Sequence, residues 1–397
     1  MGLAGSPGAT AFGDHPMQTT HFRRPVLCLP LAAAAPALAQ YQWTAVPLHP
    51  EGASGSSANA AWGDRQGGTI IDDGYGHAAI WQSAAEPWID LTPAWARASF
   101  LNGMDGDTQA GQVLIGGQTF HAALWRGSAE FVVDLHPLDG YRASDARAVS
   151  GNMQAGFAIH TQTGVRHAAV WNGTAESFVD LHPANSSQSR ALATDGVMQG
   201  GWASLPGGGD SEAVIWSGTA ESVVNLAPQN AQESRVNAMA VGIQAGSVRF
   251  PGENPRASLW RGEADSVQYL QPPNSLASEL LGTNGEMYVG TAIFEVFGEA
   301  GIWLSDDPKS FVNLQDHLPP DYRRISHATD VFVADTTIYV TGVGTPPIGP
   351  AEAWLWIGSV TSPGTLPALG GALMILHNGR RRRSASPTGE RCYPPNW

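Results

Sequence analysis

One phrase recurs along this chain, and its repetition constrains the fold more than any other feature. The clearest copy starts at His167-Ala-Ala-Val-Trp171, continues through Gly173, and ends with Asp180-Leu-His-Pro183. The tryptophan of this phrase has counterparts along the chain, which together are Trp81, Trp125, Trp171, Trp216, Trp260, Trp303 and Trp356. Their separations are 44, 46, 45, 44, 43 and 53 residues. We therefore expect seven copies of one structural unit.

Each unit is predicted to contain four short β-strands. Four serines spaced by 45 residues each precede a glutamine by ten residues, as Ser144 precedes Gln154. The segments between are short and rich in Val, Ile, Phe and Trp, and glycine-containing turns separate them. No stretch shows the sustained spacing of apolar residues that a helix requires. The pattern predicts an all-β fold, a seven-bladed β-propeller of four-stranded antiparallel blades.

The two ends of the repeat region predict how the ring closes. The last unit stops soon after Trp356 and lacks the strand that elsewhere ends in Asp-Leu-His-Pro. A matching segment, Trp43 to Pro50, precedes the first unit. The N-terminal strand is therefore expected to complete the seventh blade, which removes exposed sheet edges.

Four segments divide the chain. Residues 1–39 are predicted to be a leader and signal peptide, because Arg23-Arg24 precedes an apolar run that ends in Ala37-Leu-Ala39. Residues 40–360 form the predicted propeller. Residues 361–383 combine a short apolar stretch with four arginines and are too short to span a bilayer as a helix. Residues 384–397 are predicted to be a disordered tail.

Composition restricts the partners. Residues 40–360 contain 14 basic and 33 acidic residues, a net charge of −19, whereas the whole chain has a net charge of −14. Such a body repels phosphate backbones, so nucleic acid is not an expected partner. Both cysteines, Cys28 and Cys392, lie outside the repeats, which excludes a cysteine zinc site or disulfide framework there.

The repeat resembles that of the bacterial extracellular HAF-repeat proteins, in which His-Ala-Phe is followed by Trp and Asp-Leu, with Gly-Gln-x-x-Gly strands between. Here the phrases beginning at His77, His121 and His167 carry Ala in place of Phe. Residues 361–383 are similar to a PEP-CTERM-type sorting tail, with Pro363-Gly364 before the apolar stretch but without the Pro-Glu-Pro triplet. The resemblance implies a secreted β-propeller-like protein without a defined activity.

Histidines and acids that recur once per unit are the candidate metal ligands. One histidine set lies before the tryptophan (His77, His121, His167) and a second precedes proline (His49, His136, His182). A ring of imidazoles could bind a metal, but a residue repeated in every unit more often makes the same hydrogen bond within each blade. Asp90, Asp134, Asp180, Asn225 and Asn313 follow the tryptophans. They could hold calcium, yet their spacing fits turn capping better. We expect no cofactor, with calcium as the alternative.

No catalytic motif is present, so loops that interrupt the repeat are the better candidates for binding. The connections from second to third strand, and from fourth strand to the next first strand, should share one face. On that face we select Arg249, Arg256, Tyr322 and Arg324 as candidate ligand-binding residues. Five tryptophans outside the repeat are candidates for stacking on sugars, namely Trp62, Trp88, Trp95, Trp202 and Trp354.

These observations favour a secreted or envelope-associated, non-enzymatic interaction scaffold. The partner is expected to be a protein or a glycan, the chain a monomer, and membrane contact limited to the C-terminal sorting segment. The alternative is a secreted polysaccharide-binding protein, or a polysaccharide hydrolase or lyase. Perturbed carboxylates clustered in the central channel would favour the enzyme, and an apolar or Ser/Ala-lined channel would favour the scaffold.

Overall fold

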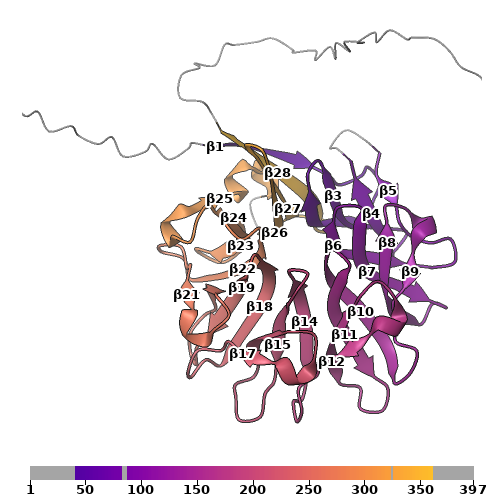
Figure 1. Ribbon diagram of the computed structural model, residues 1–397. Helices are drawn as coiled ribbons and strands as arrows, with labels where there is room; N and C mark the ends of the chain where they lie inside the picture. Colours follow the sequence, from indigo (N-terminus) through magenta and orange to yellow (C-terminus); the bar gives the residue numbers. More distant parts are fainter. Residues whose placement is uncertain (1–40, 83–86, 323–324, 361–397) are drawn as a thin grey trace, which may run out of the picture. The chain divides into compact units, whose positions relative to one another are not determined.

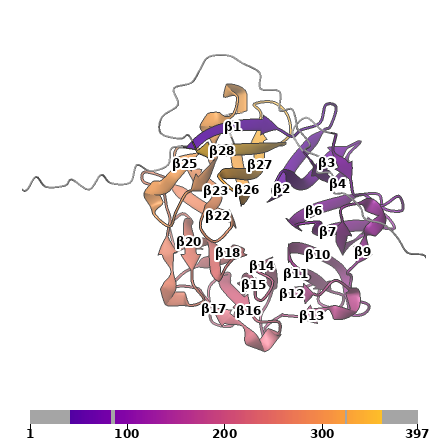
Figure 2. The same cartoon turned by 45° about the horizontal axis from the view of Figure 1, so that its top comes forward.

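Seven four-stranded antiparallel sheets surround a central channel in the computed structural model, which describes residues 41–82, 87–322 and 325–360 (Figure 1). Within each sheet, the first strand of the repeat lies innermost and the fourth outermost (Figure 2). This is the predicted seven-bladed propeller. The predicted signal peptide, sorting segment and tail lie outside the described residues. Among the described residues, no helix is both long and apolar enough to cross a membrane.

We number the blades in chain order. Blade 1 contains β2 (Gly55–Trp62), β3 (Arg65–Asp72), β4 (Tyr75–Trp81) and β5 (Ile89–Asp90). Blade 2 contains β6 (Ser99–Asp105), β7 (Thr108–Ile115), β8 (Thr119–Arg126), η1 (Ala129–Phe131) and β9 (Val133–Asp134). Blade 3 contains β10 (Tyr141–Ser150), β11 (Met153–His160), β12 (Arg166–Trp171), η2 (Ala175–Ser177) and β13 (Val179–Asp180). Blade 4 contains β14 (Ser189–Thr194), β15 (Gln199–Ala203), β16 (Glu212–Trp216), η3 (Ala220–Ser222) and β17 (Val224–Asn225).

The remaining blades follow the same order. Blade 5 contains β18 (Glu233–Ala240), β19 (Ile243–Arg249), β20 (Arg256–Trp260), η4 (Ala264–Ser266) and β21 (Gln268–Tyr269). Blade 6 contains β22 (Ala277–Thr283), β23 (Tyr288–Ile293), β24 (Gly298–Trp303), η5 (Pro308–Ser310) and β25 (Phe311–Asn313). The connection to blade 7 carries η6 (Gln315–His317) and η7 (Pro320–Tyr322). Blade 7 contains β26 (Ile325–Ala334), β27 (Thr337–Thr345), β28 (Glu352–Val360) and β1 (Tyr41–Pro47).

Strand β1 closes the ring as the sequence predicted. It pairs antiparallel with β28, in a register that runs from Tyr41 opposite Val360 to Pro47 opposite Trp354. The following residue, Leu48, donates its backbone N–H to the carbonyl of Ala353 at 2.9 Å. The N-terminal strand therefore covers the edge that β28 would otherwise expose.

A buried serine near the start of each inner strand joins neighbouring blades. Its Oγ accepts a hydrogen bond from a backbone N–H on the third strand of the preceding blade, as Ser189 does from Ala168 at 2.9 Å. The same bond occurs at all seven interfaces, to Ser56, Ser99, Ser144, Ser189, Ser234, Ser278 and Ser326. Each interface also contains one apolar cluster that includes a tryptophan of the repeat. These tryptophans are at most 3% exposed, which confirms their predicted place in the core.

The repeated glutamine fixes the turn after the tryptophan. Gln154 Oε1 accepts a hydrogen bond from the backbone N–H of Gly173 at 2.8 Å, and Gly173 has a φ of 80°. Equivalent bonds reach Gly127, Gly218 and Gly262. The turn continues into a three-residue 3₁₀ helix, and the outer strand of blades 1 to 6 has only two or three residues. The outer strands are thus shorter than the sequence predicted, because the Asp or Asn that ends them already forms a turn with the residue two positions on.

Each inner strand contains one β-bulge at the same position of the repeat. In blade 3 the bulge places the extra residue Arg147 between Ala146 and Ala148. The facing glycine of the Gln-x-Gly segment, Gly156, has no room for a side chain, since an added Cβ would lie 2.0 Å from the carbonyl oxygen of Asp145. The recurring Gln-x-Gly of the sequence is therefore the partner of a recurring bulge.

Candidate functional site

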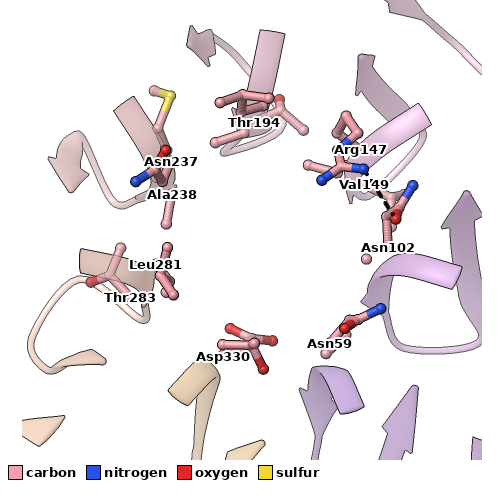
Figure 3. Close-up of a pocket in the computed structure, with 18 of the residues that line it drawn as sticks. Asn59, Asn102, Arg147, Val149, Thr194, Asn237, Ala238, Leu281, Thr283 and Asp330 are labelled. Atoms are coloured by element: carbon pink, nitrogen blue, oxygen red, sulfur yellow. Dashed lines mark hydrogen bonds between the residues drawn. The ribbon is translucent and has the colours of Figure 1, made fainter. Parts of the chain in front are cut away.

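The seven bulges direct one residue from each blade toward the central channel. These residues are Asn59, Asn102, Arg147, Leu192, Asn237, Leu281 and Thr329. They surround a space of about 170 Å³, and most of them are visible as a ring of sticks in Figure 3. Asparagine occupies three of these seven positions and leucine two, so the channel wall differs in chemistry from blade to blade while the backbone repeats.

Four of the bulged side chains connect one blade to the next. Asn102 Nδ2 donates to the carbonyl oxygen of Ala146 at 2.9 Å, and Thr329 Oγ1 donates to that of Ala58 at 2.7 Å across the ring closure. Asn59 and Asn237 make the equivalent bonds to Leu101 and Leu280. In every case the acceptor is the residue before the next bulge. Their polar groups therefore stabilise the ring, and the remaining three positions, Arg147, Leu192 and Leu281, make no such bond among the described residues.

Three carboxyl groups line or border the channel, and each already has hydrogen-bond donors. Asp330 accepts from the backbone N–H groups of Ala61 and Val331, both at 2.9 Å, and burial raises its pKa to about 6. Asp145, whose side chain is 8% exposed, accepts from Asn102 at 2.8 Å and from Arg147 at 3.3 Å. Burial also raises the pKa of Asp145, against the opposing effect of Arg147.

The third of these groups is the carboxylate of Glu279, to which Asn237 donates at 2.8 Å. Asp330 and Asp145 belong to blades 7 and 3, so the two perturbed carboxyls do not form one cluster. The channel wall combines nine apolar residues and two glycines with three asparagines, three threonines, Asp330 and Arg147, so it is neither a carboxylate cluster nor a purely apolar or Ser/Ala lining.

Arginines of three successive blades gather near the channel on the loop face, our name for the face formed by the second-to-third and fourth-to-first connections. Arg147, Arg190 and Arg235 come from the inner strands of blades 3, 4 and 5, and Arg166 begins the third strand of blade 3. Burial, followed by the charges of Arg166, Arg147 and Arg235, lowers the pKa of Arg190. We call these four residues the arginine arc.

Aromatic rings separate the guanidinium groups of the arc. The Arg190 guanidinium lies 5.2 Å from the ring centroid of Phe157, on the preceding blade, and 5.4 Å from that of Trp202. Arg235 lies 5.8 Å from the same Trp202 ring, and Arg166 lies 6.0 Å from Phe157. Cation–π contacts of this kind help to orient the guanidinium groups of Arg166, Arg190 and Arg235.

The first histidine set makes the hydrogen bond expected within each blade. His77, His121 and His167 contact Asp90, Asp134 and Asp180 through Nδ1, at 3.0, 2.9 and 2.7 Å. The other carboxylate oxygen of each aspartate accepts the backbone N–H two residues later. Asn225 and Asn313 accept the same backbone bond. The recurring acids therefore cap turns, as their spacing indicated.

The second histidine set corrects the expectation of bonds confined to one blade. His182 Nδ1 lies 2.8 Å from Ser189 Oγ on the next blade, and its Nε2 lies 3.0 Å from the carbonyl oxygen of Ser186. His49 and His136 make the same contact with Ser56 and Ser144. These imidazoles bridge blades because the Leu-His-Pro segment crosses from one outer strand toward the next inner strand. No group of three or more His, Cys, Asp or Glu suited to a metal occurs in the described part of the chain.

The structure describes three of the four predicted loop residues, and two of them, Arg249 and Arg256, lie on paired strands of blade 5. Arg249 ends β19 and binds Gln232 and Glu233, at 2.7 and 2.6 Å, whereas Arg256 begins β20 and binds Glu253 at 2.5 Å. Tyr322 lies in η7, where its hydrogen bond to Glu352 raises its pKa to about 12. Arg324 lies outside the described residues. The role of these four residues in binding stays a prediction.

The five tryptophans outside the repeat differ in exposure. Trp95, in the connection from blade 1 to blade 2, is 57% exposed. Trp62, the last residue of β2, is 38% exposed. Trp88 and Trp202 are half-buried. Trp354 is only 4% exposed, so its proposed role in stacking on sugars is wrong: it packs in the cluster between blades 6 and 7.

The arginine arc was missed at the sequence level, although a signal for it exists. Arg190 and Arg235 each directly follow a serine of the repeat, Ser189 and Ser234, and are separated by 45 residues. Such spacing places two side chains at equivalent positions of neighbouring blades. What the spacing cannot give is the aromatic ring between them.

Comparisons with known proteins support the fold. No family model and no curated protein matches the chain. A solved structure of puromycin hydrolase is similar with a TM-score of 0.50 and 13% identity over 77% of this chain, and a mutant of puromycin hydrolase complexed with PGG has a TM-score of 0.51 and 12% identity over 78%. The chain spans 52% and 56% of those two proteins. The β-propeller domain of the Trilobed protease from Pyrococcus furiosus matches over 79% of this chain and 100% of its own, with 11% identity and a TM-score of 0.48. At such identities the similarity describes architecture only.

Proposed function

We propose that this protein is an exported, non-enzymatic binding protein that acts as an interaction scaffold at the cell envelope or outside the cell. Its binding surface is the loop face around the channel mouth, where non-repeating side chains are gathered. A rigid ring that presents variable groups at one end is a common arrangement for ligand binding.

The observation that carries this proposal is the state of the channel carboxyl groups. General acid–base hydrolysis needs a proton donor and a base, both of which reach the substrate. Here both oxygens of Asp330 accept backbone N–H groups, and Asp145 is buried against Asn102 and Arg147. Carboxyl groups engaged in this way contribute to the wall of the ring, which favours binding over hydrolysis.

The serine–histidine pairs do not support nucleophilic catalysis either. Ser189 is fully buried, and its Oγ already accepts the Ala168 N–H. The aspartate near this pair, Asp180, bonds to the imidazole of His167 and only to the backbone N–H of His182, not to its imidazole. The same arrangement recurs at Ser144, as expected for a structural contact that repeats with the blades.

Export rests on the sequence outside the described residues. Residues 1–39 have the order of charge, apolar run and small residues found in signal peptides, and residues 361–383 are similar to a sorting tail. We expect the full chain to be recovered outside the cytoplasm and a chain without residues 1–39 to remain inside. Cytoplasmic recovery of both forms would contradict this part of the proposal.

Catalysis can be tested directly with the purified protein. We would incubate the wild type and Asp330→Asn with a panel of polysaccharides and measure new reducing ends and unsaturated products. The expected result is no product from either protein. Product formation by the wild type that disappears in Asp330→Asn would replace the scaffold with a channel-based polysaccharide hydrolase or lyase.

A further inference from the structure

We propose that the arginine arc binds the carboxylate groups of an acidic saccharide, such as a uronic acid oligomer. This inference rests on the proposed binding function and names its ligand class. The arc consists of Arg147, Arg166, Arg190 and Arg235. The ring of Phe157 contacts Arg166 and Arg190, and the ring of Trp202 contacts Arg190 and Arg235.

The arc has more positive charge than its own neighbours balance. Glu233 lies 2.6 Å from Arg249 but 3.8 Å from Arg235, and Asp145 is the partner of Arg147. Within the described ranges no carboxylate forms an ion pair with Arg166 or Arg190. Burial and the three other arginines lower the pKa of Arg190, and the nearby charge of Asp145 opposes this effect without reversing it. An anion bound here would relieve that repulsion.

Unused hydrogen-bond donors point in the same direction. The Nε atoms of both Arg166 and Arg190 are buried without a hydrogen-bond partner. The guanidinium group is a rigid planar fork of N–H donors, which suits bidentate binding of a carboxylate. Leaving a buried donor unsatisfied costs free energy, and a ligand oxygen recovers it only if the side chain shifts to expose Nε.

Hollows on the loop face give a ligand access to both ends of the arc. Arg147 borders a hollow of about 400 Å³ that also contains Asn102 and Phe100. Arg235 borders a second hollow of about 280 Å³ between blades 5 and 6, which is also lined by Arg249 and by the carboxylates of Glu233 and Glu279. The side chains of Arg147 and Arg235 are 41% and 45% exposed. A ligand can therefore approach along the face without entering the narrow channel.

A saccharide fits this surface better than a nucleic acid or an acidic peptide. The net charge of −14 repels dense polyanions, and this repulsion is weaker for a ligand with a few separated carboxylates. The half-buried rings of Phe157 and Trp202 add flat apolar surface beside the guanidinium groups. Such a mixture of charge and ring faces matches a carboxylated pyranose, which has both.

The test measures binding by isothermal titration calorimetry to the full mature protein. The probes are a tetragalacturonate, its fully methyl-esterified form and a tetraglutamate peptide. We expect binding of the tetragalacturonate only, with an affinity that falls as salt rises. Arg190→Gln and Arg235→Gln should each weaken it at least tenfold. Arg190→Lys keeps the charge but not the planar fork. Its affinity for the tetragalacturonate should lie between those of Arg190→Gln and the wild type.

Arg261→Gln is the matched control, because Arg261 lies beyond Trp260 in a turn at the opposite face and pairs with Asp306 at 3.2 Å. Its affinity should equal that of the wild type, and thermal unfolding of each variant confirms that it folds. Three results would each overturn the inference: no binding of the tetragalacturonate, binding unaffected by Arg190→Gln combined with Arg235→Gln, or equal binding of the tetraglutamate. Degradation of the saccharide would instead refute the non-enzymatic function while leaving the arc as its binding site.

Discussion

Ser189 shows how a single side chain can join two blades. Its Oγ accepts the backbone N–H of Ala168 and its hydroxyl donates to His182 Nδ1, so both capacities of the hydroxyl are used in a fully buried position. The same serine occurs at every interface. Residues that repeat once per blade therefore stabilise the fold. Residues that differ between most blades, such as Arg190, are the candidates for ligand binding.

Replacing Ser189 by alanine tests this account. The change leaves the Ala168 N–H buried and unsatisfied, so we expect the free energy of unfolding to fall by about 1–3 kcal/mol. Urea unfolding monitored by tryptophan fluorescence measures the change. Ser187→Ala is the control, since Ser187 is exposed and should change stability by less than about 0.5 kcal/mol. Equal stability of the two variants would show that the inter-blade bond contributes nothing.

The inter-blade histidines should make the protein sensitive to acid. Burial and the neighbouring charge of His167 lower the pKa of His182, and burial together with His121 lowers the pKa of His136. The unfolded chain therefore takes up these protons first, near pH 6.5. The stability that the neutral imidazoles contribute is present above that pH and is lost as the pH falls toward the folded pKa.

We accordingly expect the free energy of unfolding to decrease between pH 7.5 and pH 5, and less so in His182→Gln. Urea unfolding at several pH values gives the two slopes. The glutamine variant is expected to be less stable at pH 7.5 because it loses the fixed contact with Ser189. Identical slopes for the variant and the wild type would remove His182 from the explanation of acid sensitivity.

At the scale of the element, the inner strand and its bulge determine what reaches the channel. The bulge inserts an extra residue and turns its side chain inward, and the facing glycine gives the displaced carbonyl oxygen its space. Without the bulge, strict alternation along β10 would place neighbouring side chains on opposite faces of the blade. The channel chemistry therefore depends on a backbone irregularity that is repeated seven times.

Gly156→Ala tests the link between glycine and bulge. The added methyl group would meet the Asp145 carbonyl oxygen at 2.0 Å, so the backbone must move, and we expect a loss of about 1–3 kcal/mol or more. Gly55→Ala is the matched control, because its nearest neighbour would be a Pro350 side-chain carbon at 3.5 Å, an ordinary contact. Thermal unfolding of both variants separates them. A Gly156→Ala protein as stable as Gly55→Ala would show that the strand relaxes freely.

For the whole molecule, the decisive contact is the one that closes the ring. The first and last described strands, β1 and β28, pair over seven residues, and Asp330 and Thr329 join blade 7 to blade 1 beside the channel. An apolar cluster that includes Leu48 and Trp81 fills the same interface. Closure therefore uses the serine bond and apolar core of the other six interfaces, and the channel contact that three of them also have.

A chain that begins at residue 48 should lose this closure. Removing β1 leaves the β28 edge unpaired, and net contributions of about 0.5–1.5 kcal/mol per hydrogen bond predict a loss on the order of 3–5 kcal/mol. Thermal unfolding and sedimentation velocity should show a lower melting temperature and self-association through the free edge. A chain that begins at residue 40 is the control. An unchanged melting temperature would mean that β1 is dispensable.

The sequence by itself determined the repeat, the number of blades, their four strands and the strand that closes the ring. It could do so because these features depend on local patterns, such as the Trp spacing and the Gln-x-Gly segment, that recur from blade to blade. It also indicated that the repeated acids cap turns. The burial of Trp354 and the bridging role of His182 were not predicted, because both depend on contacts with a neighbouring blade.

Only the tertiary structure decided which side chains meet around the channel. Arg147, Arg190 and Arg235 are separated by 43 and 45 residues in the sequence, and no local pattern tells whether the space between them holds a carboxylate or an aromatic ring. In the structure Arg147 lines the channel, the Phe157 ring centroid lies 5.2 Å from the Arg190 guanidinium, and that of Trp202 lies within 5.8 Å of both Arg190 and Arg235. The physical reason is that each blade forms from short-range periodicity in its own segment of the sequence. The arc arises instead from packing between blades, where a side chain of one blade contacts side chains of the next.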